Sequence, residues 1–420
     1  MVVQTYDDLT RAIADVLDFD GRPRPITQSL LSRRHLYFLG FGSVARPMAQ
    51  RALDCGVLDV TLADPKRYAE KSIVSQCEPS EVGRLKVEVG RECMTARGAR
   101  VTIHPADLYD VPDGAVHANT TLIVSADNRR ADVGANRLAV RMRALLLKVN
   151  VEPMYGMVSV RAFDFRRPSP VCVECAFSAE TYSRQTHPKS CDGTGERSTG
   201  SPRILSQAAA ELGVLALTET LDESRSARWL SHELLFSLET GTATWSELTP
   251  NRSCRCDHGE SWPAMQRLAS GPESISLAEL ARSAGIVVGQ ATHARFCRQV
   301  ALQNRCEHCH HEVYGPRWLA VLDAATGDCP ICGNHLRAVP FYVHGELPLD
   351  ALNGVLEQPL AAWGVAPAAV IELTGATGRQ AFAVGSDRVR PGTVPFFAGT
   401  MRSMVARTGL SPSPCEGAAL

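Results

Sequence analysis

The sequence predicts an α/β protein whose main domain is a doubly wound, mostly parallel sheet with helices on both faces, followed by a small cysteine-rich domain. Three observations predict this architecture. Short β-branched runs alternate with amphipathic stretches between residues 35 and 165, as in parallel strands joined by helices. A glycine-rich turn at residues 40–45 directly follows the first run. Two C-x-x-C pairs near the C-terminus are spaced like metal ligands.

The expected elements follow the order of the chain. Strands are predicted at HLYFLG, VTLAD, ARVTIH, TLIVSAD, LLLKVNV and GMVSVRAF, and helices at residues 43–54, 81–95 and 131–143. Residues 178–200 are rich in small and polar residues, so an exposed loop is expected there. Ser201 and Pro202 then open a further helix. We divide the chain into an N-terminal helical extension (1–32), an α/β domain (33–262) and a C-terminal domain (263–420) that ends in a loose tail.

Composition and charge exclude several classes of protein. The 420 residues are 45% hydrophobic and 21% charged, which is typical of a soluble globular protein of two or three domains. A net charge of -1, from 44 basic and 45 acidic residues, gives no field that would attract nucleic acid or an anionic membrane. We find no apolar stretch of about 18 residues and no export signal, so a cytoplasmic location is expected. There, 14 cysteines indicate zinc ligands rather than disulfides.

Four positions indicate a nucleotide site. The turn GFGSVA at residues 40–45 is a G-x-G-x-x-A segment between a strand and a helix, which lets backbone amides approach phosphates in a Rossmann-like fold. The turn alone fits NAD, ATP or no ligand. Asp64 ends the second strand, where an acid binds a ribose. Lys86 and Asp127 decide between the nucleotides, because a phosphate-facing lysine and a magnesium-facing aspartate suit ATP rather than hydride transfer by a dehydrogenase. Singly, they also fit a surface lysine and a helix N-cap.

The order of these segments resembles the ubiquitin-activating enzyme superfamily, whose small bacterial members adenylate sulfur-carrier proteins. The resemblance covers residues 36–258 and is carried by LADPKRYAEKSIVSQ, GRLKVE, SADNRRADVGAN and PVCVECAF. It implies an ATP site formed by Gly40, Phe41, Gly42, Ser43, Asp64, Gln76 and Lys86, with Mg²⁺ held by Asp127. Lys86 and Asp127 are implied to act in catalysis.

Two positions depart from that family. Ser72 and Ser75 stand where the family loop has an asparagine and a phosphate-binding arginine. Several cations are open as substitutes: Lys66, Arg67, Lys71, Arg11, or an arginine from a second subunit. If none substitutes, the chain is a catalytically inactive binding scaffold.

Two cysteine groups indicate structural zinc. Cys306 and Cys309 precede Cys329 and Cys332 by nineteen residues, which is zinc-ribbon spacing, and four thiolates close such a site to water. A redox pair and four unrelated thiols are the alternatives. The family resemblance implies a second zinc site from Cys172, Cys175, Cys254 and Cys256. Because the last pair is C-x-C rather than C-x-x-C, His258 stays open as the replacement ligand.

Cys191 is the candidate nucleophile. It lies in the predicted loop close to Lys189 and ahead of a helix, which favours a reactive thiolate; the alternative is a spare surface thiol. The resemblance then implies adenylation of the C-terminus of a small ubiquitin-like protein, a thioester on Cys191, transfer to a conjugating enzyme, and a homodimer. That architecture is similar to bacterial conjugation systems, some linked to antiviral defence. Sulfur-carrier activation for a cofactor pathway is the second interpretation, and a non-catalytic scaffold is the third.

Overall fold

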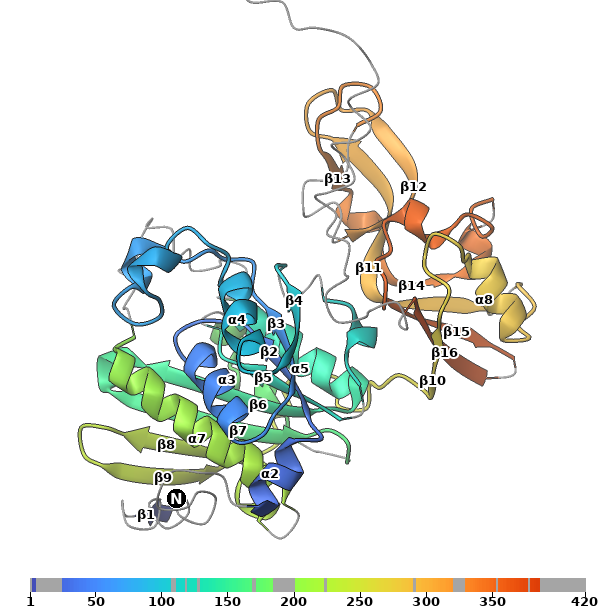
Figure 1. Cartoon of the computed structure of the whole chain (residues 1–420). Helices are drawn as coiled ribbons and strands as arrows, with labels where there is room; N and C mark the ends of the chain where they lie inside the picture. The colour runs from blue at the N-terminus through green and yellow to red at the C-terminus, as the bar shows by residue number, and fades with distance from the viewer. Residues whose placement is uncertain are drawn as a thin grey trace, which may run out of the picture.

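Two bodies, each built on its own β-sheet, make up the described part of the chain (Figure 1). The computed structural model describes residues 2–4, 25–106, 111–117, 119–126, 129–167, 171–183, 201–222, 225–289, 292–319, 329–352, 354–376 and 378–385. The first body contains the glycine turn, and the second contains the C-terminal cysteines. A segment that follows the last strand of the first body leads into the second.

Within the described residues, the first sheet has nine strands in the order β1-β9-β8-β7-β6-β5-β2-β3-β4. They are β1 (Val2–Gln4), β2 (His35–Leu39), β3 (Asp59–Ala63), β4 (Arg100–His104), β5 (Thr120–Val124), β6 (Leu145–Glu152), β7 (Met157–Asp164), β8 (His232–Ser237) and β9 (Thr242–Glu247). β6, β5, β2, β3 and β4 run parallel, whereas β7, β8, β9 and β1 extend the sheet antiparallel. The α/β prediction is confirmed.

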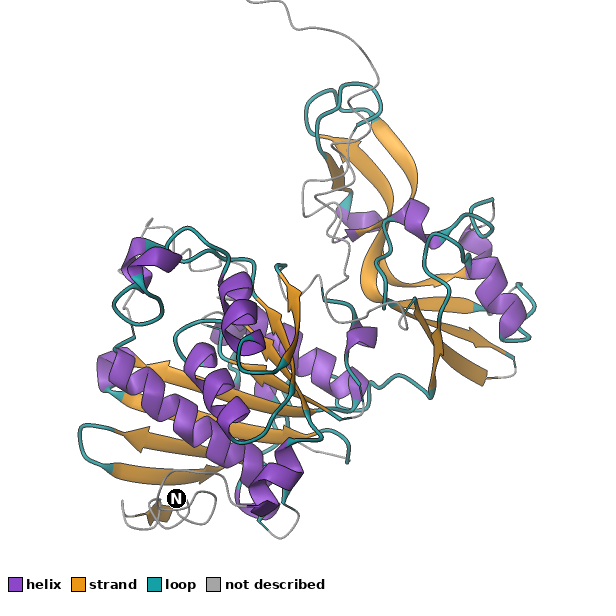
Figure 2. Ribbon diagram, in the orientation of Figure 1, coloured by secondary structure: helices purple, strands orange, loops and turns teal. Residues whose placement is uncertain are grey.

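Helices cover both faces of this sheet (Figure 2). They are α2 (Pro25–Leu31), α3 (Ala45–Asp54), α4 (Lys86–Thr95), α5 (Arg129–Met142), α6 (Ala179–Ser183) and α7 (Arg203–Leu221). Alternate residues of the central strands belong to two separate apolar clusters, one shared with α3, α4 and α7 and the other with α5. This division explains why the parallel strands read as nearly continuous apolar runs in the sequence, because both faces are buried.

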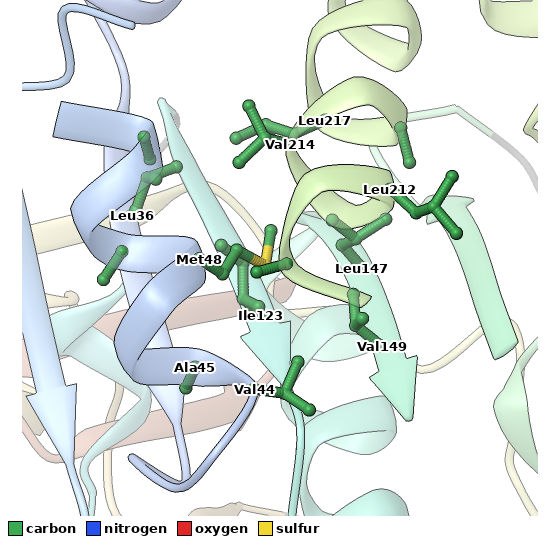
Figure 3. Packing of buried hydrophobic residues seen from close by; sticks show 14 of the residues in the cluster. Leu36, Val44, Ala45, Met48, Ile123, Leu147, Val149, Leu212, Val214 and Leu217 are labelled. Carbon is green, nitrogen blue, oxygen red and sulfur yellow. The ribbon is translucent and has the colours of Figure 1, made fainter. Parts of the chain in front are cut away.

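α3 and α7 pack together over β2, β5 and β6 (Figure 3). On α3 the buried residues Ala45, Met48, Ala49 and Ala52 follow the helical period and form one apolar stripe. α7 is long and apolar enough to cross a membrane by length and composition, contrary to our expectation for the chain, but 78% of its most apolar window is buried inside the protein. Such burial is that of the core helix of a soluble protein.

One predicted boundary was wrong. The helix expected at residues 81–95 begins at Lys86, because Gly83 adopts a positive φ of 84° and Leu85 is extended and bridges to Arg67. At the N-terminus, residues 2–4 form an edge strand paired with β9, and residues 25–31 form a helix; residues 5–24 of the expected helical extension lie outside the described residues. The strand satisfies its backbone groups by pairing with β9 instead of by forming a helix.

The second body is a sheet of seven strands in the described chain. These are β10 (Met265–Leu268), β11 (His293–Cys306), β12 (Glu312–Trp318), β13 (Leu336–Ala338), β14 (Val343–Pro348), β15 (Val370–Gly375) and β16 (Gly378–Val384). The helix α8 (Leu277–Ser283) begins with a capping box between Ser276 and Glu279. The long strand β11 pairs with β15 near its start and with β12 and β13 near its end, so it carries the chain from the core of this body to its cysteine cluster.

One buried carboxylate joins the two bodies. Asp113, which follows β4, is fully buried and accepts hydrogen bonds from Arg141 at the end of α5, at 2.6 and 3.0 Å. It also accepts bonds from Arg298 on β11, at 3.2 Å, and from the indole of Trp262, at 2.9 Å. Burial alone would raise the pKa of Asp113, but Arg141 and Arg298 outweigh it and keep the pKa below its usual value. The second body is therefore fixed to α5 by charge-assisted bonds.

Candidate functional site

The glycine turn lies at the carboxyl end of β2, where ligands bind in open α/β sheets. Gly40 adopts a φ of 88°, and a Cβ there would come within 3.3 Å of Ala126, so glycine is needed by the backbone. The buried carboxylate of Asp64 holds the turn: it accepts the amides of Phe41 and Lys66, each at 2.8 Å. Asp64 thus organises the turn, and the Phe41 amide that we expected near ATP is already engaged.

The space beside Gly42 has the features of a phosphate cradle. The amides of Gly42 and Ser43 donate to no group among the described residues, and they lie at the N-terminal end of α3, which favours anions. A Cβ on Gly42 would meet only the Gln76 side-chain oxygen, at 3.9 Å. That buried oxygen and the hydroxyl of Ser125 have no hydrogen-bond partner in the described chain. Buried polar atoms without partners are costly, so they fit a site completed by a ligand.

The loop between Asp64 and α4 explains the two serines. Both are buried, in and next to a 3-10 turn at Glu70–Ser72. The hydroxyl of Ser72 accepts the amide of Ala69 at 3.2 Å, and its carbonyl accepts the amide of Gln76 at 2.7 Å. Ser72 thus serves the local backbone, and neither serine brings a positive charge to the glycine turn.

Arg46, on the first turn of α3, is the residue that sequence reasoning missed. Its guanidinium donates to both carboxylate oxygens of Glu81, at 2.6 and 2.8 Å, and to the backbone carbonyl of Gln76, at 2.8 Å. It also lies 5.6 Å from the ring centre of Tyr68, while the ammonium of Lys86 lies 5.7 Å from the same ring. The Arg46 hydrogen bond lowers the pKa of Glu81, and burial raises the pKa of Tyr68 to about 12. In the sequence, the indication of this role was the position of an arginine four residues after Gly42.

A buried ion pair fixes the first turn of α5. Lys148 on β6 donates to Asp132, and both side chains are almost fully buried. Burial lowers the pKa of Lys148, although Asp132 opposes the shift. The second carboxylate oxygen of Asp132 has no partner in the described residues. Asp127, the expected magnesium ligand, and Cys191, the expected nucleophile, lie outside the described residues.

The first cysteine group joins distant segments of the α/β domain. The donor atoms of Cys172, Cys175, Cys254 and His258 all lie within 4.8 Å of one another, with separations from 3.5 to 4.0 Å. This group contains His258 instead of the expected Cys256. The chain turns after Cys254 so that the His258 imidazole approaches two thiols, whereas Cys256 lies beside Cys172 and raises its pKa, with burial adding to the effect.

The second group matches the expected four cysteines. The sulfurs of Cys306 and Cys332 are 3.4 Å apart, and those of Cys309 and Cys329 are 3.5 Å apart. In a tetrahedral site with zinc–sulfur bonds of about 2.3 Å, the sulfurs are about 3.8 Å apart, so the spacing fits. Backbone amides, such as that of Ile331, point at the sulfurs, which stabilises thiolates.

The structure therefore brings most of the predicted residues together. Asp64 and Gln76 border the glycine turn, and Lys86 is linked to it through the ring of Tyr68 and Arg46. Both cysteine groups assemble from segments that are far apart in the sequence.

Comparisons with known proteins found weak structural likeness. No protein-family model and no curated protein matches the chain. A solved structure of E. coli MccB with ATP is 15% identical, with a TM-score of 0.44, and the match covers 55% of this chain and 68% of that chain. A structure of PaaA is 15% identical, with a TM-score of 0.44, covering 58% and 74%. The microcin C7 biosynthetic enzyme MccB in complex with N-formylated MccA is 14% identical, with a TM-score of 0.43, covering 60% and 76%. The function proposed below therefore rests on the residues of this chain.

Proposed function

We propose that the chain is an ATP-dependent adenylyltransferase that activates the C-terminal carboxylate of a small protein or peptide. One observation carries the proposal: the amides of Gly42 and Ser43 at the start of α3 are unengaged among the described residues, and the unpartnered oxygen of Gln76 lies beside Gly42. A helix N-terminus with a small, side-chain-free approach suits the phosphates of a nucleotide. Asp64 holds the turn through two backbone amides, and in this proposal its remaining lone pairs would accept from a ribose hydroxyl.

The reaction needs position and charge rather than covalent help from the protein. A carboxylate oxygen of the partner attacks the α-phosphorus of ATP, the bond to the bridging oxygen breaks, and pyrophosphate leaves with the electron pair. The product is an acyl-adenylate. Lys86 and the amides of Gly42 and Ser43 would stabilise charge that develops on the phosphates. Asp127 would hold Mg²⁺, which neutralises phosphate charge when bound.

For the substrate we favour a ubiquitin-like protein, followed by capture on Cys191. The Cys191 thiolate would attack the acyl carbon, AMP would leave, and the thioester would pass to a conjugating enzyme. Activation of a sulfur carrier is the alternative, with the same adenylation step but no conjugating enzyme. Intact mass after incubation with ATP and candidate proteins separates these. A thioester that is lost in Cys191→Ala supports conjugation, and an adenylate without thioester supports the sulfur-carrier role.

We also propose that both cysteine groups bind structural zinc. Three thiolates and one imidazole, or four thiolates, at these separations suit a closed tetrahedral ion. In the second group β11 pairs antiparallel with β12 and β13 beside the two cysteine pairs, which supports the zinc ribbon that we propose there. Each ion would link segments that local interactions do not connect, and its binding energy would stabilise the fold.

The buried serines favour a second candidate, a non-catalytic scaffold. Ser72 and Ser75 stand where the family loop has an asparagine and a phosphate-binding arginine, and neither side chain carries a charge. ATP–pyrophosphate exchange in the presence of partner distinguishes the two. Exchange by the wild type that is lost in Lys86→Ala and Asp127→Ala supports the enzyme. Partner binding without any exchange supports the scaffold, and binding of a nicotinamide cofactor instead of ATP would point to a dehydrogenase.

A further inference from the structure

Arg46 connects the glycine turn with the loop that faces it. Its own amide donates to the carbonyl of Gly42 at 3.1 Å, so the side chain starts at the glycine turn. Its guanidinium then reaches three points of the facing loop: the hydroxyl of Tyr68 at 3.4 Å, the carbonyl of Gln76 at 2.8 Å, and the carboxylate of Glu81. A planar guanidinium suits such multiple, directed bonds, which an ammonium cannot copy.

The pairing with Glu81 decides what Arg46 does. Two parallel hydrogen bonds from Arg46 to the Glu81 carboxylate compensate the charge of the guanidinium. The side chains of Arg46 and Glu81 are only 16% and 15% exposed. An arginine engaged in this way does not present a free positive charge to phosphates. It does fix the backbone at Gln76, whose side-chain oxygen faces Gly42, and the ring of Tyr68, on which the Lys86 ammonium rests.

We infer that Arg46 is a positioning residue that orders the loop, which lacks the family arginine, by holding Gln76 and Lys86 in place before ATP binds. The inference rests on the proposed nucleotide site. Because the Arg46–Glu81 pair already orders the loop in the free protein, ATP binding does not have to supply the free energy of ordering it. Such preorganisation raises the affinity for ATP. Glu81 belongs to the same device, although it has no chemistry of its own at the phosphates.

A double-mutant cycle on Mg·ATP affinity tests this, with calorimetry as the binding measurement. Arg46→Met and Glu81→Gln are each expected to weaken binding by about tenfold, and the double variant should bind no worse than either single one. Arg46→Lys keeps the charge but not the fork, so it should bind as weakly as Arg46→Met. Arg51→Met is the matched control: it removes an arginine of similar exposure from the other end of α3, where it pairs with Glu211, and should leave affinity unchanged.

Amide exchange in nucleotide-free protein provides a readout without ligand. Residues 66–85 should exchange faster in Arg46→Met and Glu81→Gln but not in Arg51→Met. Arg46 would instead touch the phosphates directly if Glu81→Gln bound ATP as well as the wild type while Arg46→Met did not. Equal ATP affinity in all variants, with lower melting temperatures only, would leave Arg46 a purely structural residue. Both outcomes overturn the inference, whereas a wild type that does not bind Mg·ATP overturns the proposed function itself.

Discussion

Gly42→Ala separates ligand binding from folding at the proposed site. Gly42 does not have the positive φ that its neighbour Gly40 has, and an added Cβ would meet only the Gln76 oxygen, at 3.9 Å. That separation is ordinary van der Waals contact, so nothing in the described chain requires a glycine there. If residue 42 is glycine because phosphate approaches its backbone, the methyl group should block ATP and leave the fold intact.

Gly42→Ala is expected to stabilise the fold slightly and to weaken ATP binding. Replacing a glycine whose backbone suits other residues stabilises a protein by about 0.4–1 kcal/mol, because the unfolded chain loses freedom. Melting of Gly42→Ala should therefore rise by a few degrees or stay unchanged. A methyl group forced between amides and a phosphate costs about 1–3 kcal/mol by analogy with overpacking, which weakens ATP binding by about 5- to 150-fold.

Gly40→Ala is the control that should behave differently. Its φ of 88° and the 3.3 Å approach to Ala126 make alanine strained, at a cost of about 1–3 kcal/mol of folding stability. Thermal melting and ATP titration of both variants give the comparison. Wild-type ATP affinity in Gly42→Ala would refute the cradle, and a large loss of stability in Gly42→Ala would show that the glycine serves the fold.

Three further perturbations have definite outcomes. His258→Ala should remove one of two zinc equivalents from purified protein, whereas Cys256→Ser should retain both; the opposite result would make Cys256 the ligand. Burial lowers the pKa of His35 to about 4, below its unfolded value of about 6.5. As the pH falls, the unfolded chain therefore binds a proton at His35 before the folded chain does. The contribution of His35 to the free energy of unfolding is full above about pH 6.5 and falls by about 3 kcal/mol towards pH 4. In urea unfolding at several pH values, the free energy of unfolding of His35→Asn should depend less on pH than that of the wild type. Asp113→Ala leaves Arg141 and Arg298 without their carboxylate and should cost about 3–5 kcal/mol of stability, so a loss in thermal or urea melts below about 1 kcal/mol would contradict the buried network.

The sequence predicted those features that depend on local pattern. Strand positions followed from short apolar runs, and the second cysteine group followed from two C-x-x-C pairs, because both signals are contained in a few adjacent residues. The start of α4 was misplaced because a glycine at residue 83 and the extended Leu85 delay the helix. His258 stayed open because ligand choice between it and Cys256 depends on how the chain turns after Cys254.

Contacts between distant segments could not be read from the sequence. Arg46 and Glu81 are 35 residues apart, and neither belongs to a motif that suggests a pair. The same holds for Asp113, whose partners come from α5 and from β11 in the other body. Long polar side chains have many partners in principle, and only the packed fold selects one.

Among the described residues, three almost fully buried carboxylates form ion pairs along α5, one at each end and one between them. Asp132 pairs with Lys148 and Arg129, Glu174 with Arg137, and Asp113 with Arg141. Removing the basic partners of one of them leaves a buried charge without compensation. Glu174 lies between Cys172 and Cys175 in the sequence, so its ion pair with Arg137 joins α5 to the first cysteine group. The ion pair between Asp113 and Arg141 joins α5 to the second body, because Asp113 also binds Arg298 on β11.

α5 is therefore attached to β6, to the first cysteine group and to the second body. Asp127, the proposed magnesium ligand, lies two residues before this helix begins. A rigid helix that is fixed at both ends transmits a shift at one end to the other, since packed interiors do not deform gradually. Removal of a metal ion from the first cysteine group, or loss of the contact at Asp113, should thus act on the proposed nucleotide site as well as on stability. The C-terminal body contacts this helix through Asp113, which binds both Arg298 on β11 and Arg141 on α5, so we expect Asp113→Ala to lower ATP affinity as well as stability.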